Sequence, residues 1–256
     1  MKAYFISDIH LKDCEEPRSQ ILLKFLFQLE KSLSSIEPAT HLFLVGDIFD
    51  LWISSHNYFI EKFRAIVDQL RKLKSLGLEI HYFEGNHDLY LKDFWESDVG
   101  VKVHPQAKVF ELGRHRVRVE HGDLINPNDK GYLFLYKLLR SNPLPWIAKN
   151  LPSQLVKYIG LKASGASREY TSNAKSLNEA KISELIRLHV LRISAQRFDF
   201  IISGHVHLKD DQTIEIDGRH IRSINLGAWF EQAECFVLSD KTAGFSQLNK
   251  SGEWTN

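Results

Sequence analysis

The feature that most constrains this chain is a pattern that occurs five times: a short β-type run followed closely by side chains that can bind a metal ion. Each run is rich in aromatic and β-branched residues, which predicts a strand that leads into a functional loop. The runs and the residues after them are 3–6 with Asp8 and His10, 41–45 with Asp47, 79–83 with Asn86, His87 and Asp88, 116–119 with His121, and 198–203 with His205 and His207.

Residues 18–35 and 58–76, which lie between the early strands, show helical periodicity. Strands that alternate with helices, followed by hairpin-like β segments near the end of the chain, predict an α/β sandwich. The five clusters fit the rule that functional loops of such sheets lie at the carboxyl ends of the strands.

Residues 126–197 depart from this alternation, because they are mostly helical in pattern and are interrupted by prolines at 143, 145 and 152. They separate the run before His121 from the run before His205. We therefore predict one domain over residues 1–256, with a helical cap inserted at about 126–197 over the metal-bearing face.

The donors available for metal binding are carboxylate and amide oxygens and imidazole nitrogens: Asp8, His10, Asp47, Asn86, His121, His205 and His207. Oxygen donors favour Mn²⁺ or Mg²⁺, and imidazole extends the choice to Fe²⁺ or Zn²⁺. Two catalytic ions about 3.5–4 Å apart need a bridging anion, which we expect Asp47 to supply. Only two carboxylates among the donors leave such a pair positively charged, which suits a phosphate substrate.

Each motif alone has an ordinary structural explanation, since Gly-Asp recurs by chance and His-x-His is usually a surface pair. The complete ordered set, each member following a strand, is what indicates a metal centre. The other histidines are expected to be surface or hydrogen-bonded side chains: His41, His56, His81, His104, His115, His189 and His220.

This set resembles the pattern of the calcineurin-like metallophosphoesterases, D-x-H, G-D, G-N-H-[D/E], H and G-H-x-H. The resemblance implies a sandwich of two mixed β-sheets flanked by helices, and two metal ions. It implies one ion held by Asp8, His10, Asp47 and His207, and the other held by Asp47, Asn86, His121 and His205.

Within that superfamily the chain is most similar to the UDP-2,3-diacylglucosamine diphosphatases of lipid A biosynthesis. The similarity lies in residues 7–11, 46–53, 121–123, 129–132, 174–177 and 226–229. It implies hydrolysis of an acylated UDP-sugar to UMP and a lipid monophosphate by a metal-bridging hydroxide, with Mn²⁺ as the expected ion. By matching, the substrate contacts are Asn86, His87, Asp129, Tyr132, Arg168, Ser172, Lys175 and His205.

Many of these diphosphatases carry Arg where this chain has His87, and their cap Ser and Asn fall near Arg168 and Ser172 here. A histidine beside the metals can bind phosphate or protonate a departing oxygen. Asn86 and His87 are therefore expected to be catalytic. Asp88 is expected either to orient His87, as a carboxylate behind a catalytic histidine often does, or to face solvent.

The cap has an unusual charge balance. Residues 130–181 carry an excess of seven positive charges, whereas the whole chain has a net charge of +1. Apolar helices with flanking cations suit an acylated phosphate or anionic inner-membrane lipid, although a solvated amphipathic hairpin explains the pattern as well. The overall charge gives no reason to expect nucleic-acid binding.

The start of the chain has no room for the apolar region of a signal peptide, which predicts a cytoplasmic protein. The basic, apolar cap adds the hypothesis that the protein is peripheral on the inner membrane. The sequence leaves the oligomeric state open. The alternatives are a phosphodiesterase or phosphatase of the same superfamily acting on a nucleotide or other phosphate ester, which His87 favours, and last a non-catalytic metal-binding scaffold.

Overall fold

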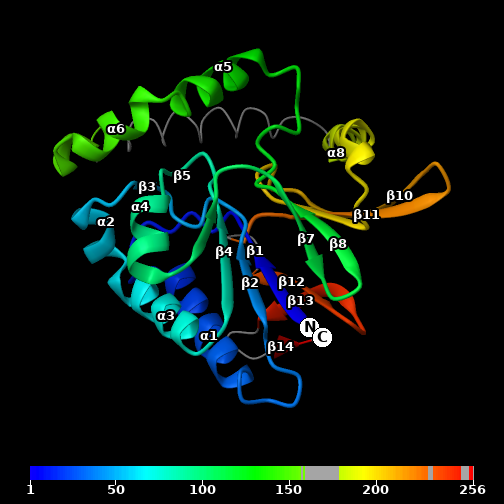
Figure 1. Cartoon of the computed structure of the whole chain (residues 1–256), viewed down its shortest axis with the longest axis horizontal. Coiled ribbons are helices and arrows are strands. Elements are labelled where there is room, and N and C mark those ends of the chain that lie inside the picture. Colours follow the sequence, from blue (N-terminus) through cyan, green and yellow to red (C-terminus); the bar gives the residue numbers. More distant parts are fainter. Residues whose placement is uncertain (157, 159–178, 230–232, 249–253, 256) are drawn as a thin grey trace.

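The computed structural model describes residues 1–156, 158, 179–229, 233–248 and 254–255. Its centre is two β-sheets packed face to face, with helices on the outer side of each (Figure 1). The predicted α/β sandwich of two mixed sheets flanked by helices is confirmed.

The first sheet has the order β14-β13-β12-β1-β2-β4-β6. Its neighbours β1, β2, β4 and β6 run parallel, and β12, β13 and β14 continue it in antiparallel pairs. The bounds are β1 Lys2–Ile6, β2 His41–Leu44, β4 Glu79–Phe83, β6 Lys102–His104, β12 Glu234–Ser239, β13 Ala243–Leu248 and β14 Trp254–Thr255.

The second sheet has the order β10-β11-β9-β8-β7. Strands β8 and β9 are parallel neighbours, so the chain leaves this sheet after β8 and returns to it at β9. The bounds are β7 Lys108–Leu112, β8 His115–Val119, β9 Phe200–Ser203, β10 Lys209–Ile216 and β11 Arg219–Leu226.

Three apolar clusters hold these layers together. One lies between the first sheet and its helices, a second lies between the sheets, and a third lies between the second sheet and α8. The helices on the first sheet are α1 Pro17–Ser32, α2 Asn57–Lys62 and α3 Arg64–Ser75, followed by the short α4 Lys92–Phe94 and the π-helical turn Trp95–Val99.

The helical structure predicted over residues 58–76 is confirmed, but it forms two helices, α2 and α3, that are divided at Phe63. Phe63 has non-helical dihedral angles and is 1% exposed. Its ring lies 4.4 Å from that of Phe49. We attribute the break to this tertiary packing, which periodicity cannot register.

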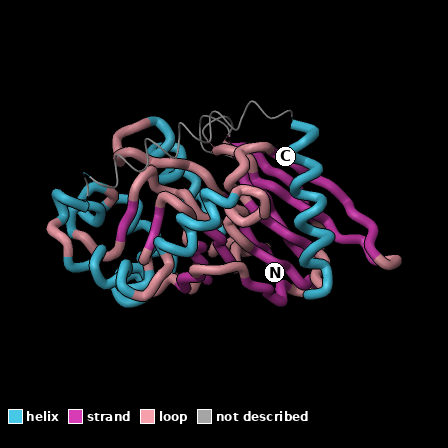
Figure 2. Tube along the Cα trace, turned by 90° about the horizontal axis from the view of Figure 1, so that it is seen from above, coloured by secondary structure: helices cyan, strands magenta, loops and turns pink. Residues whose placement is uncertain are grey.

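Between β8 and β9 the described residues are mainly helical: α5 Lys130–Leu139, α6 Pro143–Asn150 and α8 Glu179–Ile193, with a short 3₁₀ turn at Ser194–Gln196. Helices α5 and α6 lie across the end of the sandwich where β2 and β4 finish (Figure 1), and α8 covers the second sheet (Figure 2). The full extent of the predicted insertion stays a prediction. No helix in the described part of the chain is both long and apolar enough to cross a membrane.

Candidate metal centre

The loops that follow β1, β2 and β4 are bonded directly to one another. The amides of Ile9 and His10 both donate to the carbonyl oxygen of Asp47, and each N···O distance is 3.0 Å. A two-stranded parallel sheet, β3 Trp52–Ile53 with β5 Asp88–Leu89, ties the second loop to the third. These short strands have no periodicity of their own, and the sequence did not predict them.

The predicted metal ligands converge at this edge in two groups, which Asp47 links through a third group that it forms with His10 and His87. Side-chain donor atoms of Asp8, His10 and His207 lie within 4.8 Å of one another, as do those of Asp47, His121 and His205. Asp47 also forms a group with His10, so its carboxylate lies between the two sets. That position is the one expected of a bridging ligand.

The seventh predicted ligand, Asn86, lies in the second group. Its Oδ1 is 3.3 Å from Nε2 of His121. The Nδ1 of His121 faces the carbonyl oxygen of Val45 at 2.9 Å, and a carbonyl only accepts, so Nδ1 carries the proton. Nε2 of His121 is thereby left to bind a cation beside Asp47 and Asn86.

The charges of the site favour a cation at its centre. Burial raises the pKa of Asp47, but His121 and His87 more than offset this and leave it well below its usual value. Burial lowers the pKa of His121, and the Asp47 carboxylate outweighs that effect. Buried carboxylates that attract positive charge in this way, together with converging oxygen and imidazole donors, fit divalent metal ions.

Residues 1–209 match the family model described as calcineurin-like phosphoesterase. The chain belongs to this family. Family membership makes it a metal-dependent hydrolase of phosphate esters or anhydrides, and the donor set above agrees with that chemistry.

Curated relatives of this phosphoesterase extend over most of its length. A protein of Aeromonas salmonicida named UDP-2,3-diacylglucosamine hydrolase is 29% identical over 243 residues, which are 93% of this chain and 90% of the relative. A protein of the same name from Pseudomonas aeruginosa is 28% identical, over 91% of this chain and 92% of its own.

Among solved structures, a Vps29 mutant from Entamoeba histolytica is matched with a TM-score of 0.42 and 14% identity, over 100% of both chains. A predicted phosphoesterase from Streptococcus pneumoniae is matched with a TM-score of 0.43 and 12% identity, over 99% of this chain and 92% of its own.

Two glycines of the phosphoesterase motifs leave room for the ligands. A Cβ at Gly85 would lie 2.0 Å from Oδ1 of Asp47, and a Cβ at Gly204 would lie 2.2 Å from Oδ2 of Asp8. Distances this short exclude any larger residue unless a ligand moves. The glycines therefore belong to the site although they bind nothing.

His87 faces the metal ligands. Its ring centroid is 4.8 Å from that of His10, and the side chain is buried. Its Nδ1 lies 2.9 Å from the carbonyl oxygen of Asp50, which accepts a hydrogen bond from Nδ1–H. Nε2 is thus the atom available towards Asp47 and His10, where it can contact a phosphate oxygen when it is protonated.

Asp88 does not have either of the positions expected for it. It is 0% exposed, so it does not face solvent. Its oxygens accept hydrogen bonds from the Tyr82 hydroxyl at 2.6 Å, from Gly85 N at 2.7 Å, and from the amides of Ile48 and Asp47 at 3.0 and 3.1 Å. Both carboxylate oxygens of Asp88 therefore bond to the loops that carry Asp47 and Asn86, and these bonds replace the expected contact with the His87 ring. Burial and the Asp47 carboxylate raise its pKa to about 6.

Of the predicted substrate contacts on the cap, Tyr132 lies against the metal centre. Its ring centroid is 5.8 Å from that of His205, and its hydroxyl donates to Asp123 at 2.7 Å. Asp129 caps α5 by accepting from the Tyr132 amide at 2.9 Å. Arg168, Ser172 and Lys175 lie outside the described residues, so their contacts stay predictions.

Three residues with positioning contacts were not singled out from the sequence: Tyr82, Asp50 and Asp123. Tyr82 and Asp123 act through hydrogen bonds to Asp88 and Tyr132, and Asp50 acts through its backbone carbonyl, and none of these contacts has a sequence pattern of its own. Asp50 and Asp123 stand inside the matched motifs, which was the only signal available for them.

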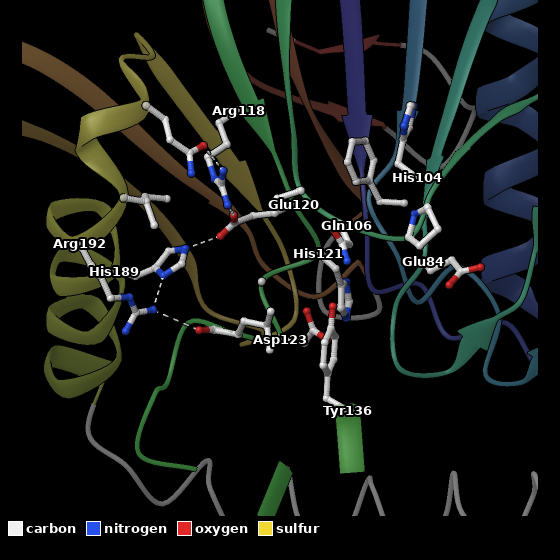
Figure 3. A pocket seen from close by; sticks show the side chains of 17 residues that line it. Glu84, His104, Gln106, Arg118, Glu120, His121, Asp123, Tyr136, His189 and Arg192 are labelled. Carbon is white, nitrogen blue, oxygen red and sulfur yellow. Dashed lines mark hydrogen bonds and ion pairs between the residues drawn. The ribbon is translucent and has the colours of Figure 1, made fainter. Parts of the chain in front are cut away.

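A cavity of about 590 Å³ opens beside His121, between the second sheet and α8 (Figure 3). Its wall carries a buried network in which Glu120 accepts from Arg118 at 2.6 Å and from His189 at 2.5 Å. Arg192 donates to Nδ1 of His189 at 2.7 Å, so His189 is fully hydrogen-bonded, as predicted. The cavity has the size of a small-ligand site.

Proposed function

We propose that this phosphoesterase hydrolyses the diphosphate of UDP-2,3-diacylglucosamine to UMP and the lipid monophosphate. One juxtaposition supports this proposal: the exposed apolar side chains of α5 and α6 lie at the same end of the sandwich as the paired groups of candidate metal ligands. The names of the curated relatives agree with this substrate.

The apolar surface consists of side chains on α5 and α6 that no other part of the described chain covers. Neither helix has a buried residue. Phe134 is 70% exposed and Trp146 is 69% exposed, and the smaller exposed contributions are Leu135, Leu138 and Ile147. Contiguous exposed apolar side chains of this kind usually mark a binding surface. Because a candidate site for phosphate lies next to this surface, we propose that the acyl chains of the substrate bind to it.

Two divalent ions at the paired ligand groups would supply a water molecule of lowered pKa and positive charge for the phosphate oxygens. We propose Mn²⁺ as the native ion. Asn86 and His87 lie where they can hold an oxygen of the attacked phosphate, and the ring of Tyr132 packs beside His205 at the edge of the site. The cavity beside His121, with Arg118 and Arg192 in its wall, is where we place the nucleoside half.

The decisive assay supplies Mn²⁺-loaded protein with UDP-2,3-diacylglucosamine, with the same UDP-sugar lacking acyl chains, or with an aryl phosphodiester, and follows UMP or phenol release. Fast UMP release that depends on the acyl chains supports the proposal. Brisk hydrolysis of the aryl ester with no UMP from the lipid would favour the phosphodiesterase alternative. No hydrolysis of any substrate at saturating Mn²⁺ would favour the non-catalytic scaffold.

We also propose that α5 and α6 contact anionic lipid, which makes the enzyme peripheral on the inner membrane. The test is co-sedimentation with anionic vesicles at low salt. Replacing Phe134 and Trp146 by Gln should abolish the binding. Phe27→Gln is the matched control, because Phe27 is 48% exposed on α1, away from the cap. Equal binding by all three proteins, or none by the wild type, would refute the contact.

A further inference from the structure

A second cluster of metal-capable side chains lies at the opposite end of the same strands. His41 begins β2, and Glu79 begins the neighbouring β4, where the two residues are directly paired. Asp47 and Asn86 follow the carboxyl ends of these strands. At about 3.3 Å per residue, the four steps along β4 from Glu79 to Phe83 alone span roughly 13 Å. In Figure 1 the amino ends of β2 and β4 lie away from the cap.

The geometry points to a transition-metal site made by His41, Glu79 and His81, distinct from the catalytic pair. A ring nitrogen of each histidine and one oxygen of Glu79 all lie within 4.8 Å of one another. Nε2 of His81 is 3.5 Å from Oε2 of Glu79. Two imidazoles and a carboxylate form a set that suits Zn²⁺, and such three-ligand zinc sites complete their coordination with water.

The tautomer of His41 is fixed by the residue before it. The Thr40 hydroxyl donates to the carbonyl of Lys2 at 2.9 Å and accepts from the amide of Lys2 at 3.0 Å. Its only proton is therefore used, so the 2.8 Å contact with Nδ1 of His41 must have Nδ1–H as the donor. Nε2 of His41 then keeps its lone pair for a cation.

His81 has a comparable partner on the next strand. Its Nδ1 lies 3.0 Å from Nε2 of His104, at the end of β6. When Nδ1–H donates to His104, Nε2 of His81 is the free nitrogen on the Glu79 side. Such a contact behind a ligating histidine sets its tautomer and orientation. Burial lowers the pKa of His41, and it lowers that of His81 to about 3, so both rings are neutral as metal binding requires.

Lys102 competes with a metal ion for the carboxylate, because its Nζ lies 2.9 Å from Oε2 of Glu79. The Lys102 side chain is 54% exposed and that of Glu79 is 45% exposed. An exposed ion pair of this kind contributes little to stability, and the lysine can turn into solvent. A divalent ion bound to three ligands would therefore displace it.

The test counts Zn²⁺ bound per full-length chain by equilibrium dialysis, in wild type and in H41Q, E79Q and H220Q. His220 is an exposed histidine on β11 and serves as the matched control. We expect H41Q and E79Q to bind one Zn²⁺ fewer than wild type and H220Q. The difference does not depend on how many ions the catalytic site holds, and circular dichroism confirms that each variant is folded.

H104Q tests the positioning role of His104. It should keep the extra Zn²⁺ but bind it 10–100-fold more weakly, because the ligands remain and only the orientation of His81 is lost. Equal Zn²⁺ stoichiometry in wild type, H41Q and E79Q would overturn the assignment. Replacement of Glu79 is the safer of the two changes if H41Q unfolds, since the Glu79 side chain is nearly half exposed.

Discussion

Asp88→Asn separates a positioning role from a chemical one. Asparagine keeps the shape of the side chain but offers one oxygen where Asp88 offers two. If the amide NH₂ replaces Oδ1, the amides of Asp47 and Gly85 both lose their acceptor. If it replaces Oδ2, the amide of Ile48 loses its acceptor and the Tyr82 hydroxyl must turn to accept.

The second orientation costs less, and it still leaves one buried amide unsatisfied at about 1–3 kcal/mol, with weaker bonds at the other donors once the charge is gone. We expect Asp88→Asn to lower the free energy of unfolding by about 2–4 kcal/mol. The amides whose hydrogen bonds are lost or weakened belong to the loops of Asp47 and Asn86. Metal affinity should therefore also fall by roughly 10–100-fold.

The assays are urea unfolding with chelator present, Mn²⁺ titration by calorimetry, and kcat at saturating Mn²⁺. Tyr82→Phe is the matched control, because it removes one donor and leaves the three amide bonds to Asp88 intact. It should change metal affinity little. A positioning role for Asp88 is refuted if Asp88→Asn and Tyr82→Phe behave alike. It is also refuted if Asp88→Asn loses kcat while keeping its metal affinity, which would make Asp88 a chemical participant.

Three further outcomes follow from the site and the sheet. Gly204→Ala should lose metal binding and activity yet stay folded by circular dichroism, because its Cβ would lie 2.2 Å from Oδ2 of Asp8; normal Mn²⁺ affinity would contradict this. The pKa of His81 is about 3 in the folded chain and about 6.5 when unfolded, so the unfolded state takes up the proton first and stability is lost as pH falls below 6.5. That loss should reach about 1–2 kcal/mol at pH 5 and vanish in His81→Gln. Chelation should abolish activity and lower the Tm, and Mn²⁺ at 100 times its Kd should restore about 2.7 kcal/mol per site; an unchanged Tm would contradict metal binding at buried carboxylates.

The strands and the ligand set could be predicted because both leave a local mark in the sequence. Strand β4 is bounded as its pattern indicates, and the Gly-Asn-His-Asp cluster after it lies in the site. What local pattern cannot give is contact between distant segments. The break at Phe63 depends on the ring of Phe49, and the position of Asp88 depends on the amides of Asp47 and Ile48, which lie 41 and 40 residues earlier in the chain.

The backbone of the site explains why its ligands cannot be judged by local preference. Nine described non-glycine residues have positive φ, and five of them are predicted metal ligands: Asp8, His10, Asp47, His205 and His207. Such a conformation costs of order 1 kcal/mol or more for each residue, and glycine would adopt it without that cost. The cost is borne by cross-loop hydrogen bonds, such as the 2.8 Å bond from the amide of His205 to Asp8. A chain selected only for stability would place glycine at these positions. Side chains that can bind metal stand there instead, so the strain itself marks the loops as shaped for ligands.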